Sequence, residues 1–138
     1  MEIKIFDRLP ADAEMIRQTV FVDEQGFMEE WDAADNDAVH IVLYDVATPV
    51  ATCRILCSDR NDTVYLGRFA VVRNKRGGGI GSQLISLVTE HLRGRGVNTV
   101  ILHAQQQAVP FYEKNGFECF GTPDEDEGCP HRWMKKEI

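Results

Sequence analysis

The sequence predicts an α/β fold with a mixed, mostly antiparallel central sheet of about six to seven strands, a parallel pair in its middle and helices on both faces. The order of strand and helix patterns carries this prediction. Residues 39–57 form two β-rich runs separated by Thr48-Pro49, which is typical of an antiparallel hairpin. Residues 64–103 contain a strand, a glycine-rich loop, a helix and a strand, and such a β-α-β unit joins parallel strands. Residues 117–121 and 131–137 add two further strands.

The N-terminal third contains a strand, a helix and a loop before the hairpin. Residues 2–6 alternate polar and apolar side chains, which predicts a short first strand. Pro10 and Asp12 mark a helix start, and apolar residues recur at helical spacing over residues 11–22. Residues 25–37 are acidic and irregular, and we expect a loop there with one helical turn.

The strand over residues 64–72 is apolar on both faces, as in a central strand covered on two sides. Strict alternation would place Tyr65, Phe69 and Val71 on one face. An apolar stripe then predicts a helix over residues 80–94.

A buried strand is predicted at residues 97–103, and a short helix at 105–115 is closed by Gly116. The two last strands are expected to be antiparallel, joined by an acidic link at residues 124–128.

Length and composition predict one domain over residues 1–138. The N-terminus lacks a basic segment followed by a long apolar run, and no window is long and apolar enough for a membrane span, so a cytoplasmic protein without membrane contact is expected. The net charge of -7 disfavours nucleic-acid binding. The four cysteines form no C-x-x-C pair and no histidine lies at zinc-finger spacing, so no metal site is expected.

The glycine-rich stretch from Val71 to Ser82 is the strongest functional feature. Three of the residues from Arg73 to Arg76 are basic, and glycines follow immediately before a helix. Free amides at a helix start and the helix dipole together favour a phosphate group, although glycines alone also fit a flexible surface turn. The loop has neither the Gly-Lys-Ser/Thr of a Walker A motif nor the third glycine of a dinucleotide-binding motif.

Two motifs together resemble the GCN5-related N-acetyltransferase (GNAT) family. The first is R-x-x-G-x-G at Arg76, Gly79 and Gly81, preceded by Phe69-Ala70-Val71. The second, A-x-x-F-Y-x-x-x-G-F, runs from Ala108 to Phe117. Three further stretches, residues 20–26, 102–105 and 128–131, are similar to the ElaA/YjcF-like subgroup. The resemblance covers essentially the whole chain in element order, and it implies that the central parallel pair is splayed.

The resemblance implies acetyl-CoA as the co-substrate. Its pyrophosphate would lie on the loop amides, and the pantetheine arm would pair with the exposed backbone of the preceding strand. Projected onto this sequence, the binding residues are Phe69, Ala70, Val71, Arg76, Gly77, Gly78, Gly79, Ile80, Gly81 and Ser82. A side chain at Gly79 or Gly81 would collide with the phosphates or prevent the required backbone angles. No metal is implied.

Tyr112 matches the family tyrosine that protonates the leaving thiolate, although an aromatic residue here could simply pack beside its neighbours. A phenol with a pKa of about 10 can donate a proton to a thiolate of similar basicity. The base that deprotonates the amine does not transfer by position. Candidates are Glu24, His103 and His131, against the simpler interpretations of a solvated loop carboxylate and hydrogen-bonded strand-end histidines.

The expected activity is acetyl transfer from acetyl-CoA to a primary amine by direct attack in a ternary complex. The acidic run over residues 23–37 favours a cationic small-molecule or peptide amine, although such runs also serve as solvated surface. The alternative is a non-catalytic coenzyme A-binding sensor or interaction module, which the presence of both Tyr112 and the glycine motif disfavours. The sequence is compatible with a monomer or a homodimer.

Overall fold

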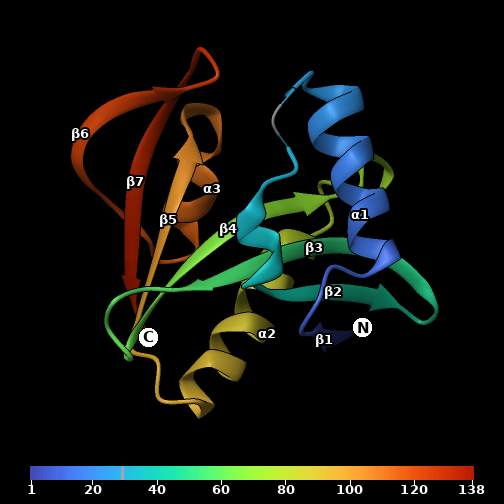
Figure 1. The fold of residues 1–138 in the computed structure, drawn as a ribbon, viewed down its shortest axis with the longest axis horizontal. Helices are drawn as coiled ribbons and strands as arrows, with labels where there is room; N and C mark the ends of the chain where they lie inside the picture. The colour runs from blue at the N-terminus through green and yellow to red at the C-terminus, as the bar shows by residue number, and fades with distance from the viewer. Residues whose placement is uncertain (29) are drawn as a thin grey trace.

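A computed structural model of the protein describes residues 1–28 and 30–138. Across these residues, seven strands form one sheet in the order β1-β2-β3-β4-β5-β7-β6. β4 and β5 lie at its middle and are parallel, while the other neighbouring pairs are antiparallel (Figure 1). The strands are β1 (Glu2–Phe6), β2 (Val39–Asp45), β3 (Thr48–Cys57), β4 (Thr63–Val71), β5 (Thr99–Gln105), β6 (Glu118–Asp126) and β7 (Cys129–Glu137).

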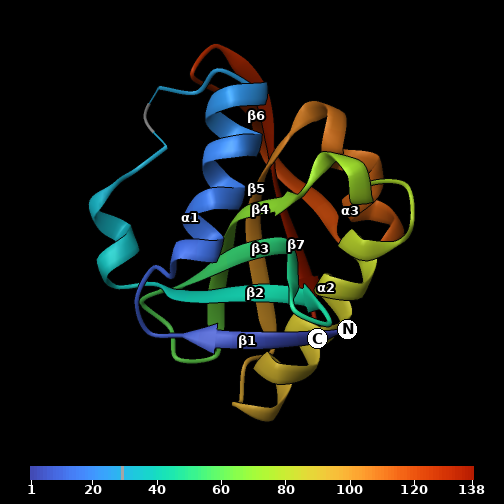
Figure 2. The same ribbon diagram turned by 90° about the vertical axis from the view of Figure 1, so that its right-hand side faces the viewer.

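Helices lie on both faces of the sheet, as predicted (Figure 2). They are α1 (Ala11–Arg17), which continues as the π-helix η1 (Gln18–Glu24), then α2 (Ile80–Gly94), α3 (Val109–Lys114) and the 3₁₀ turns η2 (Ala33–Asn36), η3 (Arg73–Lys75) and η4 (Gln106–Ala108). In the part of the chain that the structure describes, no helix combines the length and apolar character needed to cross a membrane.

The two faces of the sheet have separate hydrophobic cores. On one face, Ile16 and Val20 of the first helix pack with Val42 of β2 and Ala70 of β4. On the other face, the apolar stripe of α2, including the fully buried Leu84, packs with the strands and α3. Each buried aliphatic side chain contributes about 1.5–3 kcal/mol, so these two cores hold the central strands between the helices.

β4 and β5 pair over only part of their lengths. The parallel register runs from Thr63 opposite Thr99 to Leu66 opposite Leu102 and then stops, although both strands continue. On the other side of β4, the register with β3 shifts between Thr52 and Arg54. This is a β-bulge, and it places Arg68 at a φ of 48°. The strands therefore separate beyond Leu66 and Leu102, which confirms the splayed parallel pair.

The bulge changes which residues share a face of β4. The prediction that Tyr65, Phe69 and Val71 lie together is wrong, because strict alternation fails at Arg68. Phe69 packs on the α2 side with the core that contains Leu66. Tyr65 instead lies against Trp133 of β7, with 6.4 Å between ring centroids.

Three element boundaries also differ from the sequence-based predictions. The first helix extends to Glu24, and its second half is a π-helix. Thr48-Pro49 lies at the start of β3 and the turn precedes it, with Val46 at a φ of 57°. β6 and β7 extend through most of the acidic link, so their turn is Glu127-Gly128. At Thr48-Pro49 and in the acidic link, strand pairing continues through residues whose types usually end an element.

Candidate active site

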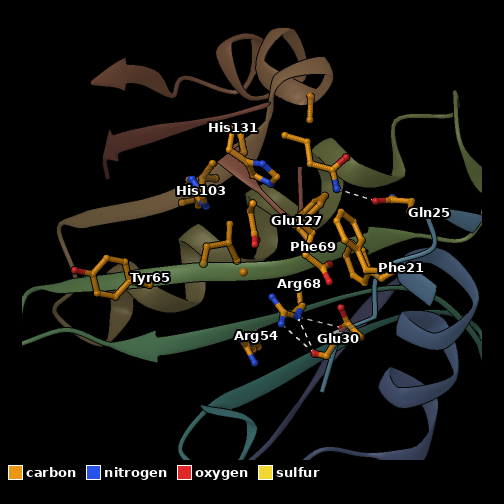
Figure 3. Close-up of a pocket in the computed structure, with 18 of the residues that line it drawn as sticks. Phe21, Gln25, Glu30, Arg54, Tyr65, Arg68, Phe69, His103, Glu127 and His131 are labelled. Carbon is orange, nitrogen blue, oxygen red and sulfur yellow. Dashed lines mark hydrogen bonds and ion pairs between the residues drawn. The ribbon is translucent and has the colours of Figure 1, made fainter. Parts of the chain in front are cut away.

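A cleft of about 1100 Å³ opens where β4 and β5 separate. Arg68 and Phe69 of β4 form its floor, and His103 of β5 and His131 of β7 lie on one wall. Phe21 of the first helix and Gln25, just after this helix, lie opposite (Figure 3). Tyr112 of α3 also contributes to the lining. Among the predicted site residues, the cleft brings together Phe69, Arg76, His103, Tyr112 and His131.

The glycine loop ends in the N-terminus of α2. Gly77 and Gly79 have φ angles of 84° and 82°, and Gly79 caps the helix. The amides from Gly77 to Ser82 donate no hydrogen bond within the described residues, and the first bond of the turn is from Gln83 to the Gly79 carbonyl. A run of free amides at the positive end of a 15-residue helix is suited to an anion such as a pyrophosphate.

Gly79 and Gly81 are required for different reasons. At Gly79 the positive φ disfavours any residue with a Cβ, as the sequence suggested. At Gly81 a Cβ would lie 2.9 Å from Cζ of Phe111, which is too close for a carbon–carbon contact. Gly81 of the motif is therefore required by the packing of α2 on α3. Helix α3 is also the element that carries Tyr112.

Arg76 of the loop is paired with Glu24 at the end of the π-helix. Its Nη1 donates to Glu24 Oε1 at 2.9 Å, and its Nε donates to the carbonyl of Val71 at 2.9 Å. Glu24 is therefore held by an arginine, which differs from the solvated loop carboxylate considered from the sequence. Nζ of Lys75 lies 3.9 Å from Oδ2 of Asp45. This ion pair is partly exposed, so it contributes little to the stability of the loop.

Tyr112 is buried within an aromatic group. Its ring lies 5.9 Å from Phe69, 5.1 Å from Phe111 and 5.7 Å from Phe117, centroid to centroid. Burial raises the pKa of Tyr112 well above that of a free phenol. The described residues provide no hydrogen-bond partner for its hydroxyl. The phenol is therefore protonated at neutral pH and is not committed to another protein group.

His103 is the first β5 residue beyond the parallel pairing, and several side chains hold its ring. Its Nε2 lies 2.7 Å from Oδ1 of Asp124. Its ring is stacked on Trp133, with 4.5 Å between ring centroids, and is tilted relative to His131, with 4.6 Å between centroids. His103 lowers the pKa of Asp124 through the hydrogen bond and its charge, so this carboxyl is ionised. Asp124 lies 21 residues away along the chain and is not among the site residues that the sequence predicts, because its acidic neighbours indicate a link between the last two strands.

His103, His131 and Asp126 together have the donor types of a metal site. One potential ligand atom from each lies within 4.8 Å of the others. However, Nε2 of His103 and Nδ1 of His131 already have hydrogen-bond partners in Asp124 and the carbonyl of Cys129, and the two imidazole rings are tilted by 30°. The arrangement suits hydrogen bonding and proton transfer better than coordination of one ion.

Three arginines neutralise the middle of the acidic run. Arg17 is fully buried and binds Glu30 at 2.6 Å and Asp35 at 2.8 Å, while Arg54 binds Asp32 at 2.7 Å and Asp35 at 2.9 Å. Arg68, at the bulge, adds contacts to Glu30 and Asp32 (Figure 3). Glu29, a further acid of this run, lies outside the described residues. The run is therefore largely an ion-pair network, and Glu30, Asp32, Arg54 and Arg68 of this network line the cleft.

The chain matches a family model described as Acetyltransferase (GNAT) domain over residues 11–138. It is 36% identical over 129 residues to the uncharacterized N-acetyltransferase YjcF of Bacillus subtilis, covering 91% of each chain. Its fold superposes on a putative N-acetyltransferase from Lactobacillus plantarum with a TM-score of 0.90, 29% identity and 99% and 97% coverage. Escherichia coli ElaA gives a TM-score of 0.85, 31% identity and 99% coverage of both chains.

Proposed function

Because the chain belongs to the GNAT acetyltransferase family, in its ElaA/YjcF-like subgroup, we propose that it transfers an acetyl group from acetyl-CoA to a primary amine by direct attack in a ternary complex. One observation carries the proposal. The parallel strands separate beyond Leu66 and Leu102 and open a cleft lined by Tyr112 and His103, while the free amides of residues 77–82 lie at the helix that follows β4.

The donor side of the site is the glycine loop with the end of β4. The amides from Gly77 to Ser82, with Arg76, hold the pyrophosphate, and the backbone of Phe69, Ala70 and Val71 faces the pantetheine arm and the thioester. The free amides and the positive φ of Gly79 support this role. A backbone N–H aimed at the thioester carbonyl stabilises the oxyanion that forms when the amine attacks.

Tyr112 is the general acid in this proposal. Its phenol gives a proton to the thiolate as the carbon–sulfur bond breaks. Burial supports the role because it excludes competing water from the phenol, although it also makes the phenol a weaker acid. A cysteine nucleophile is not used: burial raises the pKa of the Cys53 thiol far above neutrality, so this residue is a core side chain.

His103 is the general base in this proposal. It lines the cleft with Tyr112, lies just beyond the last parallel pair and is a quarter exposed. Glu24 is also a candidate base on sequence alone, but its carboxylate is engaged by Arg76. A carboxylate oxygen that already accepts a hydrogen bond from an arginine is not free to face the amine, so we assign Glu24 to holding the loop instead.

The acceptor is a cationic primary amine, either a small molecule or a peptide amine. Asp126 and Glu127 on the β6–β7 hairpin line the cleft, and Asp124 lies beside them. These acids support a preference for a cation better than residues 30–35, whose charges are balanced by arginines. Trp133 and Tyr65 offer flat surfaces beside the acidic groups for the apolar part of the acceptor.

A thiol-release screen tests this proposal against a non-catalytic coenzyme A-binding module. The purified protein is incubated with acetyl-CoA and a panel of amines, amino acids, polyamines and peptides, and free coenzyme A is measured with a thiol reagent. An enzyme releases thiol with at least one amine, above the rate without acceptor, and the product is acetylated by mass. Acetyl-CoA binding with no release for any amine would favour the module.

A further inference from the structure

We propose that Asp124 is a positioning residue that accepts a hydrogen bond from Nε2–H of His103 and so presents Nδ1 of His103 as the atom that takes the proton of the acceptor amine. The inference rests on the proposed function and deepens it. It adds a residue that orients the proposed base and names the nitrogen of that base that acts. The hydrogen bond and the tautomer can be measured without an acceptor.

The hydrogen-bond geometry selects the tautomer. Asp124 Oδ1 lies 2.7 Å from His103 Nε2, the distance of a charge-assisted bond. The Asp124 carboxylate is ionised and can only accept, so the Nε2 nitrogen must carry the proton. Nδ1 of His103 then holds the lone pair and has no partner among the described residues.

The three strands at this side of the sheet hold the ring in place. His103 on β5 lies opposite Trp133 on β7, and His131 on β7 lies opposite Asp124 on β6. A register shift in β6 between Phe120 and Asp124 brings the carboxylate to this position. Trp133 stacks on the imidazole at an interplanar angle of 24°, which limits rotation of the ring. The histidine is therefore oriented before any substrate binds.

With this assignment, every proton that moves in the proposed reaction has a donor and an acceptor. The acceptor ammonium first loses one proton to solvent, and the neutral amine nitrogen then forms a bond to the thioester carbonyl carbon as the carbon–sulfur bond breaks. Nδ1 of His103 takes a proton from the amine, Tyr112 gives one to the thiolate, and both residues return to their starting states by exchange with solvent. The Asp124 carboxylate stabilises the imidazolium while it exists, as a carboxylate does for a histidine base in general.

Other charged and titratable groups also face His103. On β6 these are Asp124 and Asp126, and on β7 the neighbour is His131, whose Nδ1 lies 2.8 Å from the carbonyl oxygen of Cys129. Of these, Asp124 alone is recorded in a hydrogen bond with the His103 ring among the described residues. An effect of Asp124 must therefore be separated from a general effect of acidic charge on the hairpin.

The test uses Asp124→Asn with Glu125→Gln as the matched control. Both remove one negative charge from an exposed residue of the same strand, but Glu125 points to the opposite face and has no recorded contact with His103. Long-range ¹H–¹⁵N spectra of the imidazoles report which nitrogen is protonated in each neutral ring. Resonances are assigned with His40→Gln, His91→Gln, His103→Gln and His131→Gln. The same proteins are then assayed for kcat, KM and pH dependence with an acceptor from the thiol-release screen.

We expect His103 to be the Nε2–H tautomer in the wild type and in Glu125→Gln, and a mixture of tautomers in Asp124→Asn. Asp124→Asn should lower kcat by about tenfold or more with little change in the KM for acetyl-CoA, and the acidic limb of its rate profile should move to lower pH. An Nδ1–H tautomer in the wild type overturns the inference, as does Asp124→Asn with a wild-type profile. If no amine is acetylated, the proposed function fails, while the tautomer result still decides whether Asp124 orients His103. Stoichiometric Zn²⁺ binding that shifts both His103 and His131 would also overturn it, since the lone pair would then serve a metal.

Discussion

Glu24 and Arg76 form an ion pair of 2.9 Å between residues 52 positions apart, and this contact joins the end of the π-helix to the glycine loop. The arginine also donates to the carbonyl of Val71, so its guanidinium is fixed over the end of β4. The ion pair thus connects the first helix, which we place on the acceptor side of the cleft, to the glycine loop that we assign to the coenzyme. A negative partner on Arg76 also competes with any phosphate for the same donors.

Glu24→Gln should strengthen acetyl-CoA binding. Removing the carboxylate frees the guanidinium for the pyrophosphate, and because the pair is partly exposed the gain should be modest, about two- to fivefold in Kd. Isothermal titration of acetyl-CoA measures it, with Asp23→Asn as a neighbouring control. Turnover should be retained. A collapse of kcat with unchanged binding would instead make Glu24 the base and remove that role from His103.

Tyr112→Phe should lower kcat by about 100-fold, the lower end of what a general acid contributes, with acetyl-CoA affinity near that of the wild type. The hydroxyl has no recorded partner, so loss of the oxygen should leave thermal stability nearly unchanged. Steady-state kinetics and calorimetry on the same preparation check both parts. Phe111→Leu is the control for packing, because it alters the same aromatic group without touching the phenol. Full activity in Tyr112→Phe would exclude the residue from proton transfer.

Gly81→Ala should destabilise the protein by about 1–2 kcal/mol, since overpacking typically costs this much and more than offsets the helix propensity of alanine. The new Cβ meets Phe111 at 2.9 Å. Gly94→Ala, at the other end of the same helix, meets nothing within 4 Å and should be neutral or slightly stabilising. Urea unfolding of the two variants measures the difference. Equal stabilities would mean that Gly81 serves the ligand alone.

The Arg54 network should make stability depend on acid pH. Hydrogen bonds from Arg54 lower the pKa of Asp32; burial alone would raise that of Asp35, but hydrogen bonds from Arg17 and Arg54 leave it lowered. A lowered folded-state pKa contributes stability that is present above the ordinary value of 3.8 and is lost as pH falls through the folded-state value. Arg54→Met should therefore be less stable at pH 6 and should lose less of its remaining stability below pH 4. Urea unfolding midpoints of the wild type and Arg54→Met, measured from pH 6 to below pH 4, test this prediction. Midpoints that change with pH in parallel for the two proteins would contradict it.

The fold could be read from the sequence because its elements are set by local patterns. Alternating residues 2–6, the apolar stripe of α2 and the β-α-β order each depend on neighbours in the chain. The bulge at Arg68 could not be read in this way. The φ of 48° at Arg68 is set by the register with β3, and no residue type near it indicates a bulge.

The donor half of the candidate site could also be predicted from the sequence, because the residues of the glycine motif are contiguous in the chain. The acceptor half was not, because contacts between distant strands build it. Asp124 contacts His103 only because β5, β7 and β6 are neighbours in the sheet. From the sequence alone, an aspartate at this position is equally typical of a turn. The acidic run was misleading for a related reason, since the arginines that neutralise it are distant in sequence or in other elements.

Thermal unfolding with acetyl-CoA is the most direct test of the central claim that the splayed cleft and residues 76–82 bind an acyl-CoA. A ligand that binds only the folded state at 100 times its Kd adds about 2.7 kcal/mol of stability. We predict a clear rise in Tm with acetyl-CoA in the wild type, and a much smaller rise in Gly79→Ala, whose backbone cannot readily adopt the φ of 82°. An unchanged Tm for the wild type at saturating acetyl-CoA would contradict the account.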